Sequence, residues 1–344
     1  MIPAALAGGL VSEEDIVWRG VSVEQIGRSH SVYRLSIADE ARAVLKAFTA
    51  RRGETDGEIA RELAVAALAK TCGAIAAITP PLLAWRGSSN IVVTQAVEGA
   101  VAWSVDRHGG GEVEPALAWS ELVSLLVPRL AAMHRATRKL AAPGSEPHPV
   151  LSGPVPWGLR VFDGDAPADV WQTPALGRLL GELATDRTVV SAIRAARANW
   201  RNLCLIHGDL KHDNILVRPA GSDQPVIVVD WEMARIGDPA WDLAGLAARL
   251  RLAGTGGDAW TDENLSGCAA LLAAYVPASG LKAPGLIRRL VQYIGAWLVM
   301  VAVQHRSTVS EGSLDDSARP LVASAVTTLR DVNKLTAALL ERVA

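Results

Sequence analysis

The segment between Leu205 and Asp230 constrains the fold of this chain more than any other part of its sequence. The apolar pair Leu205-Ile206 leads into the polar run 207–214, which reads HGDLKHDN, and an apolar run follows at once. A second apolar run, 226–229, ends at Asp230. Short apolar runs that are broken by polar residues predict buried strands joined by loops, and such loops commonly carry functional side chains.

The polar side chains of this segment predict a site for phosphoryl transfer. Asp230 follows a buried strand, where a carboxylate is costly unless it is paired or holds a metal ion. Phosphoryl transfer needs one carboxylate to orient the acceptor hydroxyl, and it needs a cation that neutralises the phosphate oxygens. Asp209 is placed for the first task, and Asn214 and Asp230 are placed to hold Mg²⁺, which prefers oxygen ligands.

A lysine in an apolar run supplies a further charge. Lys46 lies within the run 43–48, and its ammonium has a reason to be buried there if it meets phosphate oxygens. Glu62 follows sixteen residues later on a predicted helix and is a candidate partner for Lys46. Glu58 lies one turn earlier on the same helix face and is the alternative partner.

The predicted secondary structure changes near residue 99 from mainly short strands to mainly helices. Before it, short runs predict strands at 21–26, 31–37, 43–48, 82–85 and 90–97 around one helix at 55–70. The polar turn that contains Gly27 and Ser29 joins the first two strands and could cover phosphates with backbone N–H groups. These features predict a small antiparallel β lobe, residues 1–97, that binds the nucleotide.

Residues 98–344 predict a large, mainly helical lobe with the catalytic loop and the acceptor site. The predicted helices cover 115–135, 175–184, 188–200, 239–252, 262–276, 284–306 and 317–342. Between 137 and 174 the chain holds seven of its 18 prolines, which predicts an irregular excursion without a core. Trp157 and Trp171 lie in this excursion, and acceptor binding is an open alternative for both. Core packing is the expectation for Trp231 and Trp241.

The ordered set of Lys46, Glu62, His-Gly-Asp, Asn214 and Asp230 resembles the aminoglycoside phosphotransferase and choline-kinase-like family, a branch of the protein-kinase-like fold. The resemblance implies a bilobal α+β fold that binds ATP and Mg²⁺. It implies the following roles: catalytic base for Asp209, metal ligands for Asn214 and Asp230, phosphate binding for Lys46 with Glu62 as its partner, and adenine contacts for the hinge around Gln95 and Val97. Only Gly27 stands where protein kinases carry three glycines.

Two further segments resemble the same family. Residues 237–244 match its Gly-Asp-Pro-x-x-Asp segment, in which Asp238 and Asp242 are expected to cap a helix and brace the loop. His207 is expected to be a structural hydrogen-bonding residue. Lys211 lies where Ser/Thr protein kinases also place a lysine, which implies that it approaches the γ-phosphate and a Ser/Thr-type hydroxyl.

The charge balance of the chain argues against some classes of acceptor. The chain has a net charge of −2, and from residue 240 onward nine acidic side chains face ten basic ones. A nucleic-acid binder would show a basic surplus, and a site for a polycationic aminoglycoside would favour an acidic lobe. The motifs also resemble the kinase subunits of class V lanthipeptide and thioamitide clusters. That resemblance implies Ser/Thr of a precursor peptide as acceptor and a lyase as partner protein. A small-molecule kinase, and a pseudokinase that binds a peptide or partner, remain the alternatives.

Neither targeting nor membrane insertion is expected from the sequence. The apolar window 290–303 is shorter than the ~20 residues that span a bilayer, so it predicts a buried helix. Three cysteines, far apart in the sequence, predict neither a disulfide framework nor a zinc cluster. We therefore expect a cytoplasmic enzyme that contacts no membrane.

Overall fold

The structure is a computed structural model in which the chain forms two compact units. It describes residues 5–6, 9–26, 31–48, 55–86, 90–97, 99–101, 117–163, 174–253, 259–307 and 314–343. Unit 1 joins Met1–Leu117 to Asp213–Ala234, and unit 2 joins Ala118–His212 to Arg235–Ala344. The functional boundary at residue 97 stays a prediction, because this division rests on compactness alone.

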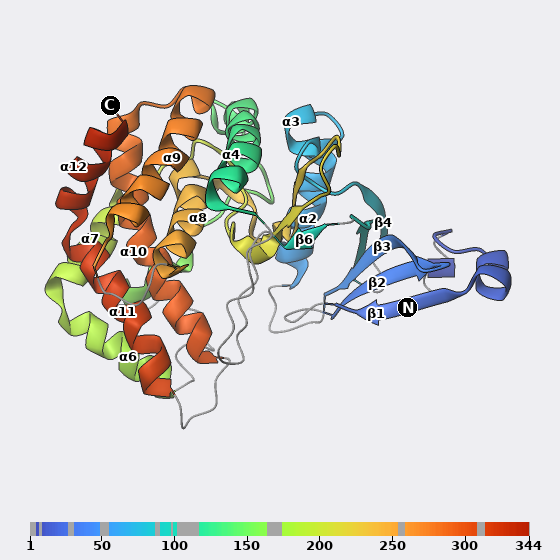
Figure 1. The fold of residues 1–344 in the computed structure, drawn as a ribbon, viewed down its shortest axis with the longest axis horizontal. Coiled ribbons are helices and arrows are strands. Elements are labelled where there is room, and N and C mark those ends of the chain that lie inside the picture. The colour runs from blue at the N-terminus through green and yellow to red at the C-terminus, as the bar shows by residue number, and fades with distance from the viewer. Residues whose placement is uncertain are drawn as a thin grey trace. The chain divides into compact units, whose positions relative to one another are not determined.

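A five-stranded antiparallel sheet dominates unit 1 (Figure 1). Its order is β1-β2-β3-β5-β4, with bounds Val21–Gln25, Ser31–Ile37, Glu40–Ala47, Ile91–Gln95 and Leu82–Arg86. Ala38 and Asp39 both have positive φ, 51° and 64°, as a two-residue hairpin turn between β2 and β3 requires. Leu35, Leu45 and Val93 form part of the core on one face of the sheet. The predicted antiparallel β lobe is confirmed.

The helix α2 (Thr55–Ala69) lies where the apolar spacing predicts a helix. Its Ile59 packs with Phe48 and Val92, next to the strand that carries Lys46. The short helix α3 (Gly73–Ala76) follows and was not expected from the sequence. The packing of α2 against the sheet therefore fixes the position of Glu62, on the polar face of α2, relative to β3.

A second, three-stranded sheet in unit 1 carries the predicted metal ligands. Its order is β6 (Ala100–Val101), β8 (Ile215–Val217) and β9 (Val226–Val228). A Cβ at Gly99 would lie 2.7 Å from the carbonyl oxygen of Val217, so only glycine permits this approach. The N–H of Val229 donates to the carbonyl oxygen of Asn214 at 2.9 Å, which ties the ends of β8 and β9 together.

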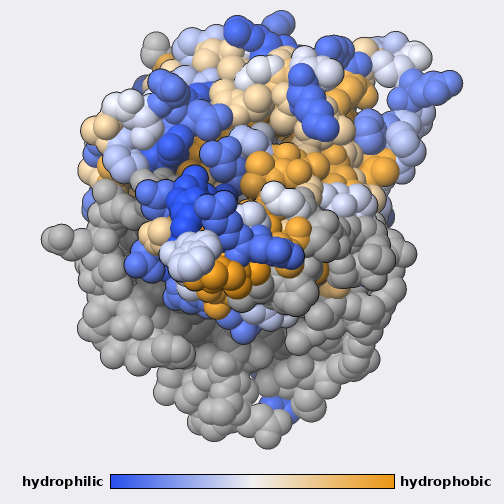
Figure 2. Space-filling view, turned by 90° about the vertical axis from the view of Figure 1, so that its right-hand side faces the viewer, coloured by the Kyte–Doolittle hydropathy of each residue, from blue (hydrophilic) through white to orange (hydrophobic). Residues whose placement is uncertain are grey.

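Unit 1 also exposes apolar side chains near its N-terminal end. Val17 and Trp18, in the short helix η1 (Asp15–Arg19), are among its most exposed large apolar residues. Figure 2 shows one face of the molecule, on which hydrophobic and hydrophilic side chains lie in adjacent patches.

Unit 2 is mainly helical, as predicted. Its helices are α4 (Trp119–Ala136), α6 (Pro174–Thr185), α7 (Arg187–Ala198), α8 (Pro239–Ala253), α9 (Asp262–Ser279), α10 (Ala283–Ser307), α11 (Leu314–Arg330) and α12 (Val332–Val343). The span Ala283–Val303 of α10 is long and apolar enough to cross a membrane, but 89% of its apolar window is buried inside the protein. The prediction of a buried core helix is confirmed.

Two predictions about this unit are wrong. The single helix expected at 317–342 is interrupted at Asp331, so that α11 and α12 are separate. The proline-rich excursion was expected to lack a core, yet Leu151, Leu159 and Val161 are fully buried. Prolines remove backbone donors but leave the apolar side chains between them free to pack.

Two three-residue strands lie next to the predicted catalytic loop in unit 2. β7 (Cys204–Ile206) pairs antiparallel with β10 (Arg235–Gly237), and the N–H of Ile236 donates to the carbonyl oxygen of Leu151 at 2.8 Å. All three residues of β7 are buried. The loop that begins at His207 therefore starts from a fixed and buried point.

Candidate functional site

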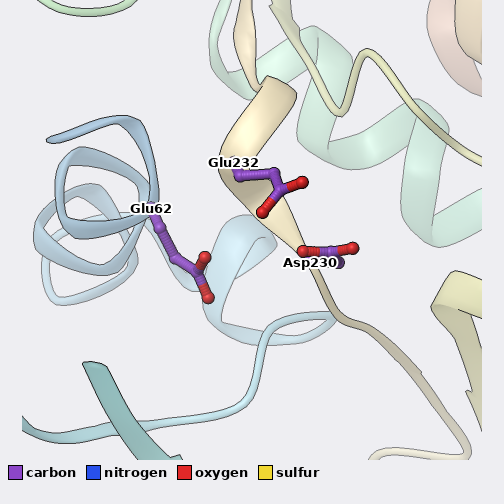
Figure 3. A group of neighbouring side chains, drawn as sticks. All are labelled: Glu62, Asp230 and Glu232. Atoms are coloured by element: carbon purple, nitrogen blue, oxygen red, sulfur yellow. The ribbon is translucent and has the colours of Figure 1, made fainter. Parts of the chain in front are cut away.

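Lys46 lies at the centre of a charge cluster in unit 1. Its Nζ lies 3.1 Å from Oε2 of Glu62 and 2.7 Å from Oε2 of Glu232, and it also donates to Oδ1 of Asp230. Figure 3 shows the three carboxylates, Glu62 from α2 and the other two from the segment after β9, converging on one space. Of the two candidate partners, Glu62 is therefore the one that the structure pairs with Lys46.

The backbone after β9 presents two of these carboxylates. Asp230 adopts a left-handed conformation, φ 69° and ψ 58°, before the short helix η7 (Trp231–Met233). Trp231 is buried, as expected, and its Nε1 donates to the carbonyl oxygen of Val228 at 2.8 Å. Arg61 of α2 donates from Nε to the carbonyl oxygen of Glu232. A left-handed residue before η7 and two anchoring contacts thus hold the segment that carries Asp230 and Glu232.

Burial and charge act in opposite directions on the pKa values in this cluster. Burial alone would lower the pKa of Lys46, but Glu62, Asp230 and Glu232 outweigh it and raise that pKa above its usual value. Burial raises the pKa of Glu62, and Lys46 offsets only part of that rise. Lys46 is therefore a permanent cation, suited to bind phosphate oxygens.

The same carboxylates fit a divalent cation. Glu62, Asp230 and Glu232 each offer an oxygen, and these oxygens lie within 4.8 Å of one another. Asn214, buried at the end of η6 (His212–Asn214), belongs to the same unit and is linked to the strand before Asp230 through Val229. An all-oxygen donor set of this kind is what Mg²⁺ prefers. Sequence reasoning singled out Asn214 and Asp230 but missed Glu232, whose signal was its place two residues after Asp230.

The predicted catalytic loop belongs to unit 2. Its Asp209 accepts from Nζ of Lys211 at 2.7 Å, and its own N–H donates to Nδ1 of His207 at 3.2 Å. The side chains of Asp209 and Lys211 are both partly exposed. The two predicted catalytic residues are thus brought together, while His207 holds the backbone of the loop.

A buried carboxylate braces this loop. Asp242 accepts the backbone N–H of His207 at 2.8 Å and that of Gly208 at 3.0 Å. Its Oδ2 also lies 3.2 Å from Nε2 of His134, whose Nδ1 lies 2.8 Å from the hydroxyl of Tyr275. This contact set links α4, α8 and α9 to the loop and confirms the bracing role expected for Asp242.

Asp238 performs the second expected structural role. Its Oδ1 caps α8 by accepting the N–H of Ala240 at 3.1 Å, and its Oδ2 accepts from Nε of Arg289 at 2.6 Å and from the Tyr293 hydroxyl at 3.1 Å. Burial raises the pKa of Asp238, and Arg289 opposes that rise. An acid so fully occupied has no face left for a substrate.

The tryptophans divide between core and open positions. Trp241 is fully buried, donates from Nε1 to the carbonyl oxygen of Gly208 at 2.9 Å, and packs against Trp200 and Trp297. The core role expected for Trp241 is confirmed. Trp157 begins the short helix η4 (Trp157–Leu159) and is only half-buried, and Trp171 lies outside the described residues.

The remaining predicted nucleotide contacts are placed in part. The N–H of Gln95, at the end of β5, donates to the carbonyl oxygen of Pro81 at 2.8 Å, and Val97 follows two residues later. Gly27 and Ser29 lie outside the described residues. Asp209 and Lys211 belong to unit 2 and Asn214 and Asp230 to unit 1, so each part of the predicted site is described by itself.

Comparison with protein families gives one match over most of the chain. The sequence profile of the phosphotransferase enzyme family matches residues 22–305. None of the curated protein sequences matches the chain.

Solved structures share the fold at low sequence identity. The microcompartment-associated aminopropanol kinase superposes with a TM-score of 0.64 and 14% identity, covering 97% of this chain and 98% of that one. Choline kinase LicA from Streptococcus pneumoniae, also solved in complex with AMP, gives 0.58 and 15% over 96% and 99%. Macrolide 2'-phosphotransferase MphH from Brachybacterium faecium gives 0.52 and 19% over 88% and 91%. The predicted protein-kinase-like fold is confirmed.

Proposed function

The chain belongs to the phosphotransferase enzyme family, and we propose that it transfers the γ-phosphate of ATP, bound with Mg²⁺, to the hydroxyl of Ser or Thr in a precursor peptide. The observation that carries the proposal is the cluster of Lys46, Glu62, Asp230 and Glu232, which offers a permanent cation and an oxygen-rich cation site within one unit. Phosphoryl transfer depends on this combination of positioning and charge neutralisation.

Each residue has one task in this proposal. Lys46 binds phosphate oxygens of the nucleotide, and Glu62 holds its ammonium. Asn214 and Asp230, with Glu232, hold Mg²⁺, which supplies neutralisation of the phosphate charge. Asp209 orients the acceptor hydroxyl and accepts its proton as the hydroxyl oxygen attacks the γ-phosphorus, while the bond from that phosphorus to the β–γ bridging oxygen breaks and ADP leaves. Gln95 and Val97, with the turn around Gly27 and Ser29, complete the nucleotide site.

Lys211 favours a peptide hydroxyl over a cationic small molecule. Its ammonium lies 2.7 Å from Oδ2 of Asp209 and so accompanies the base. A Ser or Thr side chain carries no charge and tolerates this cation, whereas an aminoglycoside or choline would be repelled by it. A lyase that eliminates phosphate from the modified residue is the partner we propose, and the reducing cytoplasm, which suits three free cysteines, is the compartment.

A small alcohol is the second candidate acceptor. The aminopropanol kinase and the choline kinase named above carry small alcohols in their names and share the fold over nearly the whole chain. A binding-only role is the third, and the complete acid set of the cluster argues against it.

Mass spectrometry after incubation with Mg-ATP separates these candidates. The acceptors are Ser/Thr-containing peptides, choline, aminopropanol, a macrolide and an aminoglycoside, and the expected product is a peptide that has gained one phosphoryl group. Asp209→Asn should abolish the product, and Asp223→Asn, which changes an exposed acid in unit 1, should not. Phosphate on a small alcohol alone would transfer the assignment to the second candidate. Equal product from the parent and Asp209→Asn would refute the role of Asp209, and no product with any acceptor would favour binding alone.

A further inference from the structure

Unit 2 contains a surface cavity that the proposed reaction does not use. The cavity has a volume of about 390 Å³ and lies between α7, α10 and the junction of α11 and α12. That volume is within the range of small-molecule binding sites, roughly 300–1,000 Å³. None of the described residues that line it belongs to unit 1 or to the loop 207–211.

Three arginines from three different elements meet at this cavity. They are Arg187 on α7, Arg288 on α10 and Arg330 at the end of α11. Arg330 binds Oδ2 of Asp186 at 2.6 Å, but no ion pair of Arg187 or Arg288 is found within the described residues. No carboxylate is among the described residues that line the cavity.

Two other arginines of the same unit do have acidic partners. Arg342 pairs with Asp262 at 2.8 Å, and Arg197 pairs with Asp163. Guanidinium groups that line one cavity without enough counter-charge repel one another, and an anion between them removes that repulsion. The unbalanced positive charge therefore indicates an anionic ligand.

The other polar side chains of the cavity can each donate a hydrogen bond. Gln292 lines the cavity and is almost fully buried, and its Oε1 accepts from Nδ2 of Asn199 at 3.2 Å, so its amide nitrogen is the group that can donate. Thr188 and Ser191 of α7 also line the cavity and carry hydroxyls. Donors in this number match the oxygens of a phosphate group better than a single negative charge.

Part of the wall of the cavity is apolar. Leu329 and Val332, on either side of the α11–α12 junction, are buried and line it. Apolar surface of this kind suits the carbon skeleton of a ligand rather than a bare inorganic ion.

We propose that this cavity binds a small organic phosphate, with the phosphate group held by Arg187, Arg288 and Arg330 and the carbon skeleton against Leu329 and Val332. Guanidinium groups recognise phosphate oxygens through paired, charge-assisted hydrogen bonds. The site is separate from the proposed nucleotide site, because the two share no residue.

Calorimetric titration of the full chain with glycerol 3-phosphate tests the proposal. A saturating non-hydrolysable ATP analogue with Mg²⁺ is kept present, so that binding at the nucleotide site does not contribute heat. We expect one saturable site per chain, with affinity that falls as salt is added. Arg288→Glu and Arg187→Glu should each weaken binding about tenfold or more, in keeping with the loss of a charged hydrogen-bond donor.

Arg178→Glu is the matched control, because Arg178 is an exposed arginine on α6 that does not line the cavity. It should bind glycerol 3-phosphate as the parent does. Circular dichroism checks that each variant is folded, and Arg288→Gln replaces Arg288→Glu if the charge reversal unfolds the protein. No saturable binding by the parent, or equal affinity in all variants, would overturn the proposal. Tighter binding of citrate than of glycerol 3-phosphate would overturn the assignment to phosphate.

Discussion

Both units hold acidic side chains away from solvent, but the partners of those acids differ. In unit 1, Glu62, Asp230 and Glu232 share the single ammonium of Lys46, and the side chain of Asp230 keeps 27% of its surface exposed. In unit 2, Asp238 and Asp242 are fully buried and accept backbone N–H groups.

This difference in partners distinguishes acids that are available to a ligand from acids that stabilise the fold. A metal ion or a phosphate can replace one carboxylate or the ammonium in unit 1 without breaking any backbone hydrogen bond of the sheet. Replacing Asp242 would leave two buried backbone donors and His134 without their acceptor, which costs free energy of folding. In the function we propose, acids of the same chemistry thus bind a ligand in unit 1, whereas those of unit 2 support the fold.

The largest expected effect on activity comes from Asp209, which lies in the loop that the buried Asp242 supports. Asp209→Asn should lower kcat by roughly 10²–10⁴-fold, because a general base typically contributes that much. Its melting temperature should stay near that of the parent, since the side chain of Asp209 is partly exposed and accepts from Lys211, which is also partly exposed. Steady-state kinetics and thermal unfolding measure both, and a large loss of stability would place Asp209 among the supporting acids.

Asp242→Ala should do the reverse and lower the free energy of unfolding by about 3 kcal/mol, because three donors lose their acceptor in a buried site. Urea unfolding measures the loss. Asp262→Ala, at a largely exposed acid that pairs with Arg342, is the control and should change stability far less. If both variants lose the same stability, the bracing role of Asp242 is wrong.

Glu232→Gln sharpens the unit 1 side of the comparison. We expect the Mg²⁺ concentration that gives half-maximal activity to rise about tenfold, as loss of an oxygen ligand or its neighbour typically causes. Glu58→Gln, one turn before Glu62 on α2, should leave it little changed. Equal shifts in the two variants would show that Glu232 has no special place at the cation site.

The smallest effect concerns thiol reactivity and leaves the fold untouched. Burial raises the pKa of Cys268 to about 12 and also raises that of Cys204, so both remain thiols, the unreactive form, at pH 8. Cys72 in unit 1 is only half-buried. Iodoacetamide at pH 8 should therefore label Cys72 in the native protein and the other two only after urea is added. Labelling of Cys204 or Cys268 without denaturant would contradict the burial of unit 2.

Most of the architecture could be predicted because its signals are local. The period of α2 and the apolar runs of β2 and β3 follow from the sequence alone. The break at Asp331 could not be predicted, because an aspartate is tolerated inside a helix and only the packing of α11 and α12 decides otherwise. The apolar pair Leu205-Ile206 indicates β7, but β10, three residues long, is too short to show a period.

The site divides in the same way. Asp209, Asn214 and Asp230 stand in a continuous motif, and so they could be found. The contact of Glu232 with Lys46 spans 186 residues, and the place of Glu232 two residues after Asp230 does not reveal a partner so far away in the sequence. The burial of residues in the proline-rich stretch, Leu151 among them, could not be predicted, because their partners lie far away in sequence.

The central claim, that the acids of unit 1 bind a metal-nucleotide complex, is tested most directly by calorimetric titration with a non-hydrolysable ATP analogue. The parent and Asp223→Asn should bind the analogue about tenfold or more tightly when Mg²⁺ is present, and Asp230→Asn should lose that gain. If Asp230→Asn responds to Mg²⁺ as the parent does, the assignment of this cluster to the metal-nucleotide complex is wrong.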